Sequence, residues 1–180
     1  LNNWRPVNFA FVYLVVFFIA LLMFGVNPWL SIIGAVAFAF SSYFFIIIEA
    51  GHLTKVMAIG YMPAVIASFY YAYNKKRLLG VILFGIFLSL QILVNHLQIT
   101  YYTGLVLLMF IIFQIGDAIK NKTYKHFLTT SGFLLIIGFI AIGSNLDKLW
   151  TTYEYGKDSM RGKSELTDEI HNKTTGLDKD

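Results

Sequence analysis

Residues 29–55, WLSIIGAVAFAFSSYFFIIIEAGHLTK, decide the fold class of this chain. The first twenty of them carry no charge, and an apolar helix of about 20 residues is long enough to cross a bilayer core of about 30 Å. The apolar run leads directly into Glu49, His52 and Lys55, which follow one another at intervals of three residues. The stretch therefore predicts a membrane-spanning helix that ends in a short ionisable patch.

The composition of the whole chain agrees with a membrane protein. Of its 180 residues 57% are hydrophobic and 13% are charged, whereas a soluble domain carries about 25% charged residues. The alternation of apolar and polar residues typical of an outer-membrane barrel is missing, and the lack of cysteine excludes disulfides and thiolate metal sites. We therefore predict an all-α fold, a polytopic transmembrane helical bundle of about six spans.

Working outward from residues 29–55, the same length criterion predicts the other spans. The preceding apolar run ends in a tight turn, in which Asn27 can cap the next helix and Pro28 can start it. Small residues in the second span suit close helix contact. The predicted spans lie near residues 7–24, 29–48, 56–73, 78–94, 99–115 and 127–142, within a bundle domain of residues 1–146.

The C-terminal tail, residues 147–180, differs in charge from the rest. It holds six Lys and Arg against eight Asp and Glu, a net of −2, while the preceding part holds eight against two, a net of +6. Apolar residues at helical spacing predict an amphipathic helix on the membrane surface, ending near Gly156, before a water-exposed region begins. These apolar residues are Leu146, Leu149, Trp150 and Tyr153.

The basic residues of the short turns predict the orientation in the membrane. With six spans, alternate turns lie on opposite sides, and one side collects six basic residues against a single acid, Asp117. Short loops rich in Lys and Arg mark the cytoplasmic face. We therefore expect the ionisable patch, the turn at residues 95–98 and the tail to share the extracytoplasmic side. The six basic residues are Lys75, Lys76, Arg77, Lys120, Lys122 and Lys125.

Glu49, His52 and Lys55 are the main candidates for a binding site, because charges near hydrocarbon need partners, water or a function. One interpretation is structural, a helix end that meets the headgroups with its charges neutralised. The other is a polar pocket, in which His52 and Lys55 donate to an anionic head group while Glu49 orients them or acts as a base.

The turn between the fourth and fifth predicted spans supplies further candidates. A hydrogen-bonded hairpin turn explains them, and so does a second wall of the same pocket. Gln91, one helical turn earlier, extends the polar face into the membrane and favours the pocket. The candidates in this turn are Asn95, His96, Gln98 and Tyr101.

Two further patterns involve metals and phosphates. Glu49-x-x-His52 has the carboxylate–histidine spacing of di-iron bundles, but such sites need a second pair and further glutamates, which the chain lacks. No metal site is therefore predicted. In the tail, Lys157 and Arg161 stand at i and i+4 and could clamp a phosphate, although solvated surface charge is the commoner explanation. Nucleic-acid binding has no support, because the basic residues lie in short juxtamembrane loops.

Three blocks of the sequence resemble the bacterial YfhO-like membrane proteins. That family looks like the GT-C type of glycosyltransferase, polytopic and inverting, with metal dependence that varies by subfamily. The resemblance implies a place in the bacterial inner membrane and a polyprenyl-phosphate sugar donor used outside the cytoplasm, with a glycan or a protein as the acceptor. The blocks are FAFSSYFFIIIEAGHLTK with IGYMP within residues 38–63, NHLQITYY at 95–102 and TYEYGKDSMR at 152–161.

The resemblance also implies a catalytic acid in the first large extracytoplasmic loop. No segment of this chain matches that loop, and its first turn, residues 25–28, contains no acid. We therefore expect an internal fragment that begins after the catalytic loop, and a divalent metal in the parent protein stays open. The alternatives are a transporter or lipid flippase with Pro63 as a hinge, and a non-catalytic membrane scaffold.

Overall fold

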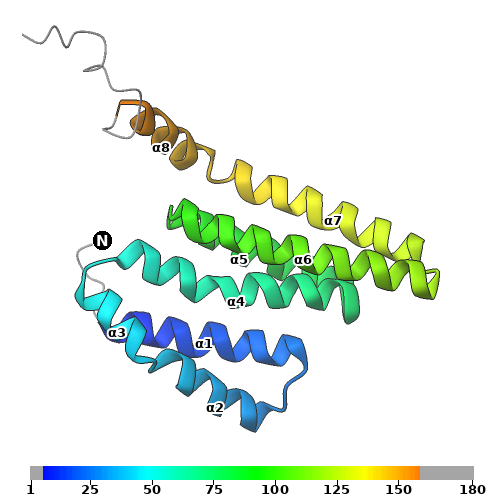
Figure 1. Cartoon of the computed structure of the whole chain (residues 1–180), viewed down its shortest axis with the longest axis horizontal. Helices are drawn as coiled ribbons and strands as arrows, with labels where there is room; N and C mark the ends of the chain where they lie inside the picture. The colour runs from blue at the N-terminus through cyan, green and yellow to red at the C-terminus, as the bar shows by residue number, and fades with distance from the viewer. Residues whose placement is uncertain (1–5, 159–180) are drawn as a thin grey trace, which may run out of the picture. The chain divides into compact units, whose positions relative to one another are not determined.

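The computed structural model describes residues 6–158, and every element in that range is an α-helix (Figure 1). Helices α1 to α7 belong to one compact unit that ends at Asn145, and α8 belongs to a second unit that begins at Leu146. The helices are α1 (Pro6–Phe24), α2 (Pro28–Ala39), α3 (Ser42–Glu49), α4 (Leu53–Asn74), α5 (Arg77–Leu93), α6 (Leu97–Asn121), α7 (Tyr124–Gly143) and α8 (Leu146–Asp158).

The helices of the first unit have the length and composition of membrane spans. Five stretches are long and apolar enough to cross a bilayer, and α5 is a shorter apolar helix of 17 residues. The predicted all-α, multi-pass membrane bundle is therefore confirmed. The five stretches are Val7–Phe24, Pro28–Glu49, Leu53–Asn74, Leu97–Asn121 and Tyr124–Gly143.

The turn between α1 and α2 forms as the sequence predicts. Gly25 takes a left-handed conformation with φ 86°, which glycine adopts at little cost. Asn27 is the N-cap of α2, and its side-chain oxygen accepts a hydrogen bond of 2.9 Å from the backbone N–H of Trp29. Pro28 occupies the first helical position, where its missing N–H has no helical partner to lose.

The stretch from Pro28 to Glu49 differs from the uninterrupted helix predicted for residues 29–48. Helix α2 ends at Ala39 and α3 begins at Ser42, with Ser41 as the N-cap residue of α3. Aromatic rings pack around the break: the ring centroid of Tyr13 lies 5.6 Å from that of Phe38 and 4.3 Å from that of Phe44. Helix α3 can therefore leave the direction of α2 before it reaches Glu49.

The connection between the fifth and sixth predicted spans, 99–115 and 127–142, is the second difference. Helix α6 continues to Asn121, whose side chain donates a 2.8 Å hydrogen bond to Asp117 one turn earlier. Lys122 adopts the left-handed conformation that ends the helix, and the N–H of Thr123 bonds to the carbonyl of Ala118. Only two residues therefore connect α6 to α7.

Helix α4 is the centre of the bundle and packs against α1, α5, α6 and α7. It continues through Pro63, and small residues repeat along one face at intervals of four. Small side chains let two helix backbones approach closely. A methyl group added to Gly80 of α5 would collide with the backbone of Ala72, so α4 and α5 touch there. The small residues of the repeat are Gly60, Ala64, Ser68 and Ala72, all buried.

The turns of the first unit gather at two opposite ends (Figure 1). We call one the basic end, formed by residues 25–27, 75–76 and 122–123. At this end Lys75 Nζ approaches within 4.0 Å of the position that a Cβ on Gly25 would take, and His126 Nε2 lies 2.9 Å from the carbonyl oxygen of Tyr73. We call the other the histidine end, formed by residues 50–52 and 94–96.

Candidate functional site

His52, Lys55 and His96 gather at the histidine end although they come from two separate turns. Burial lowers the pKa of His96, and the charges of Lys55 and His52 lower this pKa further. The turns before α4 and α6 lie at the same end of the unit (Figure 1), and α4 packs against α6. The structure therefore places the start of α4 beside the start of α6.

The backbone around Gly51 positions His52 and Lys55. Gly51 has φ 76° and lets the chain reverse between α3 and α4. His52 is the N-cap residue of α4, and Lys55 lies in the first turn of that helix. The hydroxyl of Tyr13, fully buried in α1, donates a 2.7 Å hydrogen bond to the carbonyl of Val56. This bond fixes the first turn of α4 against α1.

The ammonium group of Lys55 is not neutralised by the nearby acid. Glu49 is exposed at the end of α3, and the structure shows no ion pair between these two described residues. Instead, Lys55 Nζ lies 5.7 Å from the centroid of the Tyr43 ring, within cation–π range. Sequence reasoning missed Tyr43, because no signal in the sequence predicts the break after Ala39 that lets α3 begin beside it.

His96 has an unsatisfied ring nitrogen. It is the N-cap residue of α6, and its Nε2 atom is shielded from solvent without a hydrogen-bond partner. Asn95 precedes it with φ 56°, a left-handed conformation that asparagine tolerates better than most residues. A shielded polar atom without a partner is costly, so a ligand that bonds to Nε2 would remove this cost.

The helix termini add positive potential to the cluster. Helices α4 and α6 both begin here, and neither has an acidic residue in its first turn or a side-chain hydrogen bond at its cap. The free N–H groups of a helix start carry a partial positive charge and favour anions. Together with Lys55 and the two imidazoles, they form a site suited to a phosphate or a carboxylate.

Gln98 and Tyr101 lie on the exposed face of α6. The Gln98 side chain donates a 2.9 Å hydrogen bond to the hydroxyl of Tyr102 within the same helix. Tyr101 is 63% exposed, whereas Ile99 and Thr103 form the buried face. These contacts belong to the surface of one helix, and the second wall predicted for the pocket stays a prediction.

Gln91 has a structural role that differs from the predicted extension of the pocket. It is fully buried, and its Nε2 donates to the carbonyl of Ala58 at 3.3 Å and to the hydroxyl of Thr103 at 2.8 Å. Ala58 belongs to α4 and Thr103 to α6. Gln91 therefore ties three helices together next to the candidate site.

A second polar cluster joins α5 to the end of α7, and sequence reasoning missed it. Asn145 is 2% exposed, and its Nδ2 donates to the Ser89 hydroxyl at 3.0 Å and to the carbonyl of Ala141 at 2.9 Å. The signal was the Ser144–Asn145 pair directly after the last span. The cluster uses its own members as hydrogen-bond partners, which favours a structural role.

The second unit is described only as far as Asp158. In α8, Lys157 Nζ lies 4.3 Å from the ring centroid of Tyr153, and the indole N–H of Trp150 donates a 2.8 Å hydrogen bond to Glu154. Trp150 and Tyr153 are both exposed, as expected for a helix at a membrane surface. Arg161 lies outside the described residues, so the clamp predicted for Lys157 and Arg161 stays a prediction.

The arrangement of possible metal ligands and the comparison with known proteins do not identify the site further. Among residues 6–158, no group of three or more His, Asp or Glu side chains is arranged to hold a metal ion. Comparison of the chain with protein-family models, curated proteins and solved structures finds no match. The chemistry of the site therefore rests on its own residues.

The lowered pKa of His96 predicts that acid destabilises the bundle. As the pH falls through the ordinary imidazole value of 6.5, the unfolded chain takes up a proton before the folded chain does, so the free energy of unfolding decreases below that pH. Unfolding in detergent micelles at pH 5 to 8 measures this slope. In His96→Gln the slope should be smaller, and a slope equal to that of the unsubstituted chain would contradict the assignment.

Proposed function

We propose that the histidine end binds the phosphate of a lipid carrier, and that the chain is the membrane-embedded part of a GT-C-like glycosyltransferase. The observation that carries the proposal is the convergence of Lys55, His52 and His96 with two uncapped helix starts. A phosphate supplies acceptor oxygens for all of these donors, and its negative charge offsets the positive potential.

The position of the cluster at an end of the bundle supports a ligand anchored in lipid. A polyprenyl phosphate keeps its chain in the hydrocarbon and its phosphate at the interface, where residues 50–52 and 94–96 lie. Apolar side chains near this end face outward: Leu97 is 49% and Ile46 is 65% exposed. A carrier chain can therefore lie against the bundle while its phosphate reaches Lys55.

The proposed orientation follows from charge. The basic end has Lys75, Lys76 and Arg77 in one turn and Lys122 in another, so the positive-inside rule assigns it to the cytoplasm. The histidine end then faces outward, where the YfhO-like resemblance expects the sugar donor. We propose the bacterial inner membrane as the location, with a glycan or a protein as the acceptor.

Binding of undecaprenyl phosphate tests the proposal. The chain in detergent is titrated with this lipid and, separately, with undecaprenol, and bound lipid is counted by native mass spectrometry. The double variant His52→Ala/Lys55→Ala should weaken phosphate binding about 10²- to 10⁴-fold, since it removes two donors and each hydrogen bond to a charged group contributes about 1.5–3 kcal/mol. In the parent enzyme it should abolish use of the lipid-linked sugar without affecting membrane insertion.

Lys120→Gln is the matched control, because it removes one charge from an exposed position near the basic end. Its affinity for undecaprenyl phosphate should equal that of the unsubstituted chain. Equal binding of phosphate and alcohol, or equal binding by the double variant and the control, would remove the proposed phosphate site.

A transporter or flippase would require a different interior of the bundle. It needs polar groups that line a path across the membrane. Within the described spans, the buried polar side chains Ser68, Thr103 and Gln91 bond to backbone carbonyls or to one another, while Thr130 Oγ1 and Gln91 Oε1 are shielded without a partner. Their hydrogen bonds serve helix packing, which supports the interfacial enzyme over a transport path.

A further inference from the structure

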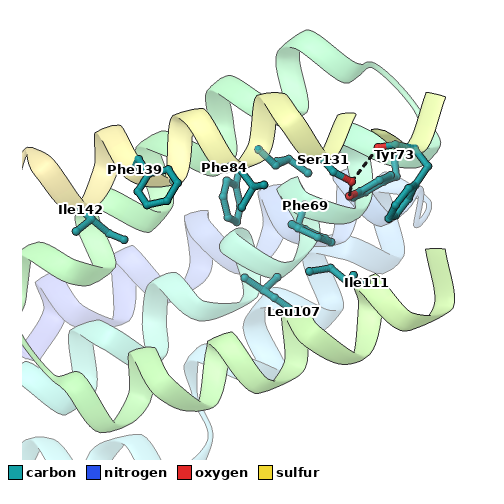
Figure 2. Close-up of a pocket in the computed structure, with 12 residues that line it drawn as sticks. Phe69, Tyr73, Phe84, Leu107, Ile111, Ser131, Phe139 and Ile142 are labelled. Carbon is teal, nitrogen blue, oxygen red and sulfur yellow. Dashed lines mark hydrogen bonds between the residues drawn. The ribbon is translucent and has the colours of Figure 1, made fainter. Parts of the chain in front are cut away.

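An apolar groove of about 410 Å³ runs along α7 (Figure 2). Helix α6 packs mainly on α4 and α7 mainly on α5, while α6 and α7 touch each other little, which leaves the groove between them. Leu135 and Phe139 line it and are 63% and 71% exposed, so it opens on the surface of the bundle. In a membrane-spanning chain this surface faces hydrocarbon.

The groove follows nearly a whole span. Its lining residues on α7 extend from Phe127 to Ile142, a length of about 22 Å at 1.5 Å per residue. One leaflet of the hydrocarbon core is about 15 Å thick. The groove is therefore long enough to hold a lipid chain throughout one leaflet.

At the basic end, polar side chains lie at the end of the groove. Near Phe127 the hydroxyl of Tyr73 lies 2.7 Å from that of Ser131 (Figure 2). Just beyond, His126 Nε2 lies 2.9 Å from the carbonyl oxygen of Tyr73, and Arg77 Nη2 lies 2.6 Å from His126 Nδ1. The carbonyl can only accept and the guanidinium can only donate, so Nε2 is the donor and Nδ1 the acceptor in these two contacts.

Arg77 keeps unused hydrogen-bonding capacity at this position. A guanidinium has five N–H donors. Among residues 6–158, the side-chain partner of Arg77 is His126, and its shielded Nε–H has no partner. The acid of this end, Asp117, already accepts from Asn121. An anion at the mouth of the groove would therefore meet an arginine that no carboxylate of the described residues neutralises.

We propose that the groove binds one chain of an anionic phospholipid, whose phosphate is held by Arg77 at the basic end. Charge complementarity selects this occupant, because the groove is apolar along its length and ends in an uncompensated cation. A whole helix does not fit: a cylinder about 10 Å across and 20 Å long occupies about 1600 Å³. The site is at the opposite end from the proposed carrier site and independent of it.

Lipid binding to the purified chain tests the proposal. The chain in mild detergent is titrated with dioleoylphosphatidylglycerol and with dioleoylphosphatidylcholine, and bound lipids are counted by native mass spectrometry. The unsubstituted chain should prefer phosphatidylglycerol. Arg77→Gln should reduce this preference at least about fivefold, the ratio that corresponds to about 1 kcal/mol for one basic residue near anionic lipid.

Lys75→Gln is the charge-matched control, since it removes a charge from the same turn but lies beside Gly25, on the α1–α2 side. It should leave the preference unchanged. An equal loss in both variants, or equal binding of the two lipids by the unsubstituted chain, would overturn the proposal in favour of general surface charge.

Gly138→Phe tests the groove independently of Arg77. A Cβ at Gly138 meets no atom within 4 Å, so the added ring can enter the groove without disturbing the helices. This variant should keep its helix content and lose the bound phospholipid, whereas Gly132→Phe, equally open but outside the groove, should keep it. Retained lipid in Gly138→Phe, or a dimer that phosphatidylglycerol does not dissociate, would show that a chain of lipid does not fill the groove.

Discussion

Gly80→Ala should lower the free energy of unfolding by about 3 kcal/mol, at the upper end of the range for overpacked sites. The added methyl group would overlap the backbone nitrogen, Cα and Cβ of Ala72. A flexible side chain could rotate away, but the backbone of a helix cannot. Helices α4 and α5 would have to separate along the most extensive contact of the bundle. Unfolding by sodium dodecyl sulfate in mixed micelles, followed by circular dichroism, measures the loss.

Gly104→Ala is the control, because it makes the same glycine-to-alanine change at a position with free space. Gly104 also lies within an apolar helix, α6, but a Cβ there meets no atom within 4 Å. Alanine favours a helix over glycine by up to about 1 kcal/mol, so the stability should stay the same or rise. A similar loss in both variants would show that close approach to Ala72 is not the cause.

Gln91→Ala should destabilise the bundle by about 2–4 kcal/mol, as expected when a long buried side chain is truncated. The substitution removes the bonds to Ala58 and Thr103 and leaves a cavity where α4, α5 and α6 meet. The same unfolding measurement checks the loss.

Gln91→Leu separates packing from hydrogen bonding. Leucine nearly fills the volume, and it removes the Gln91 Oε1 atom, which is buried without a partner. Interhelical hydrogen bonds in membranes contribute about 0.6 kcal/mol on average, so Gln91→Leu should change the stability by less than about 1 kcal/mol. If leucine destabilised as much as alanine, the hydrogen bonds rather than the packing would dominate at this site.

Part of the candidate site could be predicted from the sequence. Charged and imidazole groups directly after apolar runs are visible in the chain, and counting spans puts the turns of Lys55 and His96 at one end. The pairing of Lys55 with the ring of Tyr43 could not be predicted, because it depends on the break after Ala39 that redirects α3. Likewise, the sequence did not show that the Gln98 side chain bonds to Tyr102 within its own helix. Nor did it show that the Nε2 atom of His96 is shielded from solvent.

The sequence by itself determined that this chain is a helical membrane bundle, since runs of about 20 apolar residues leave the backbone no other way to satisfy its hydrogen bonds in lipid. It also determined the cap at Asn27, because a cap depends only on neighbouring residues. Only the tertiary structure decided which face of each helix is buried. All faces of these helices are apolar, so periodicity carries no signal, and contacts such as Gly80 with Ala72 arise from shape alone.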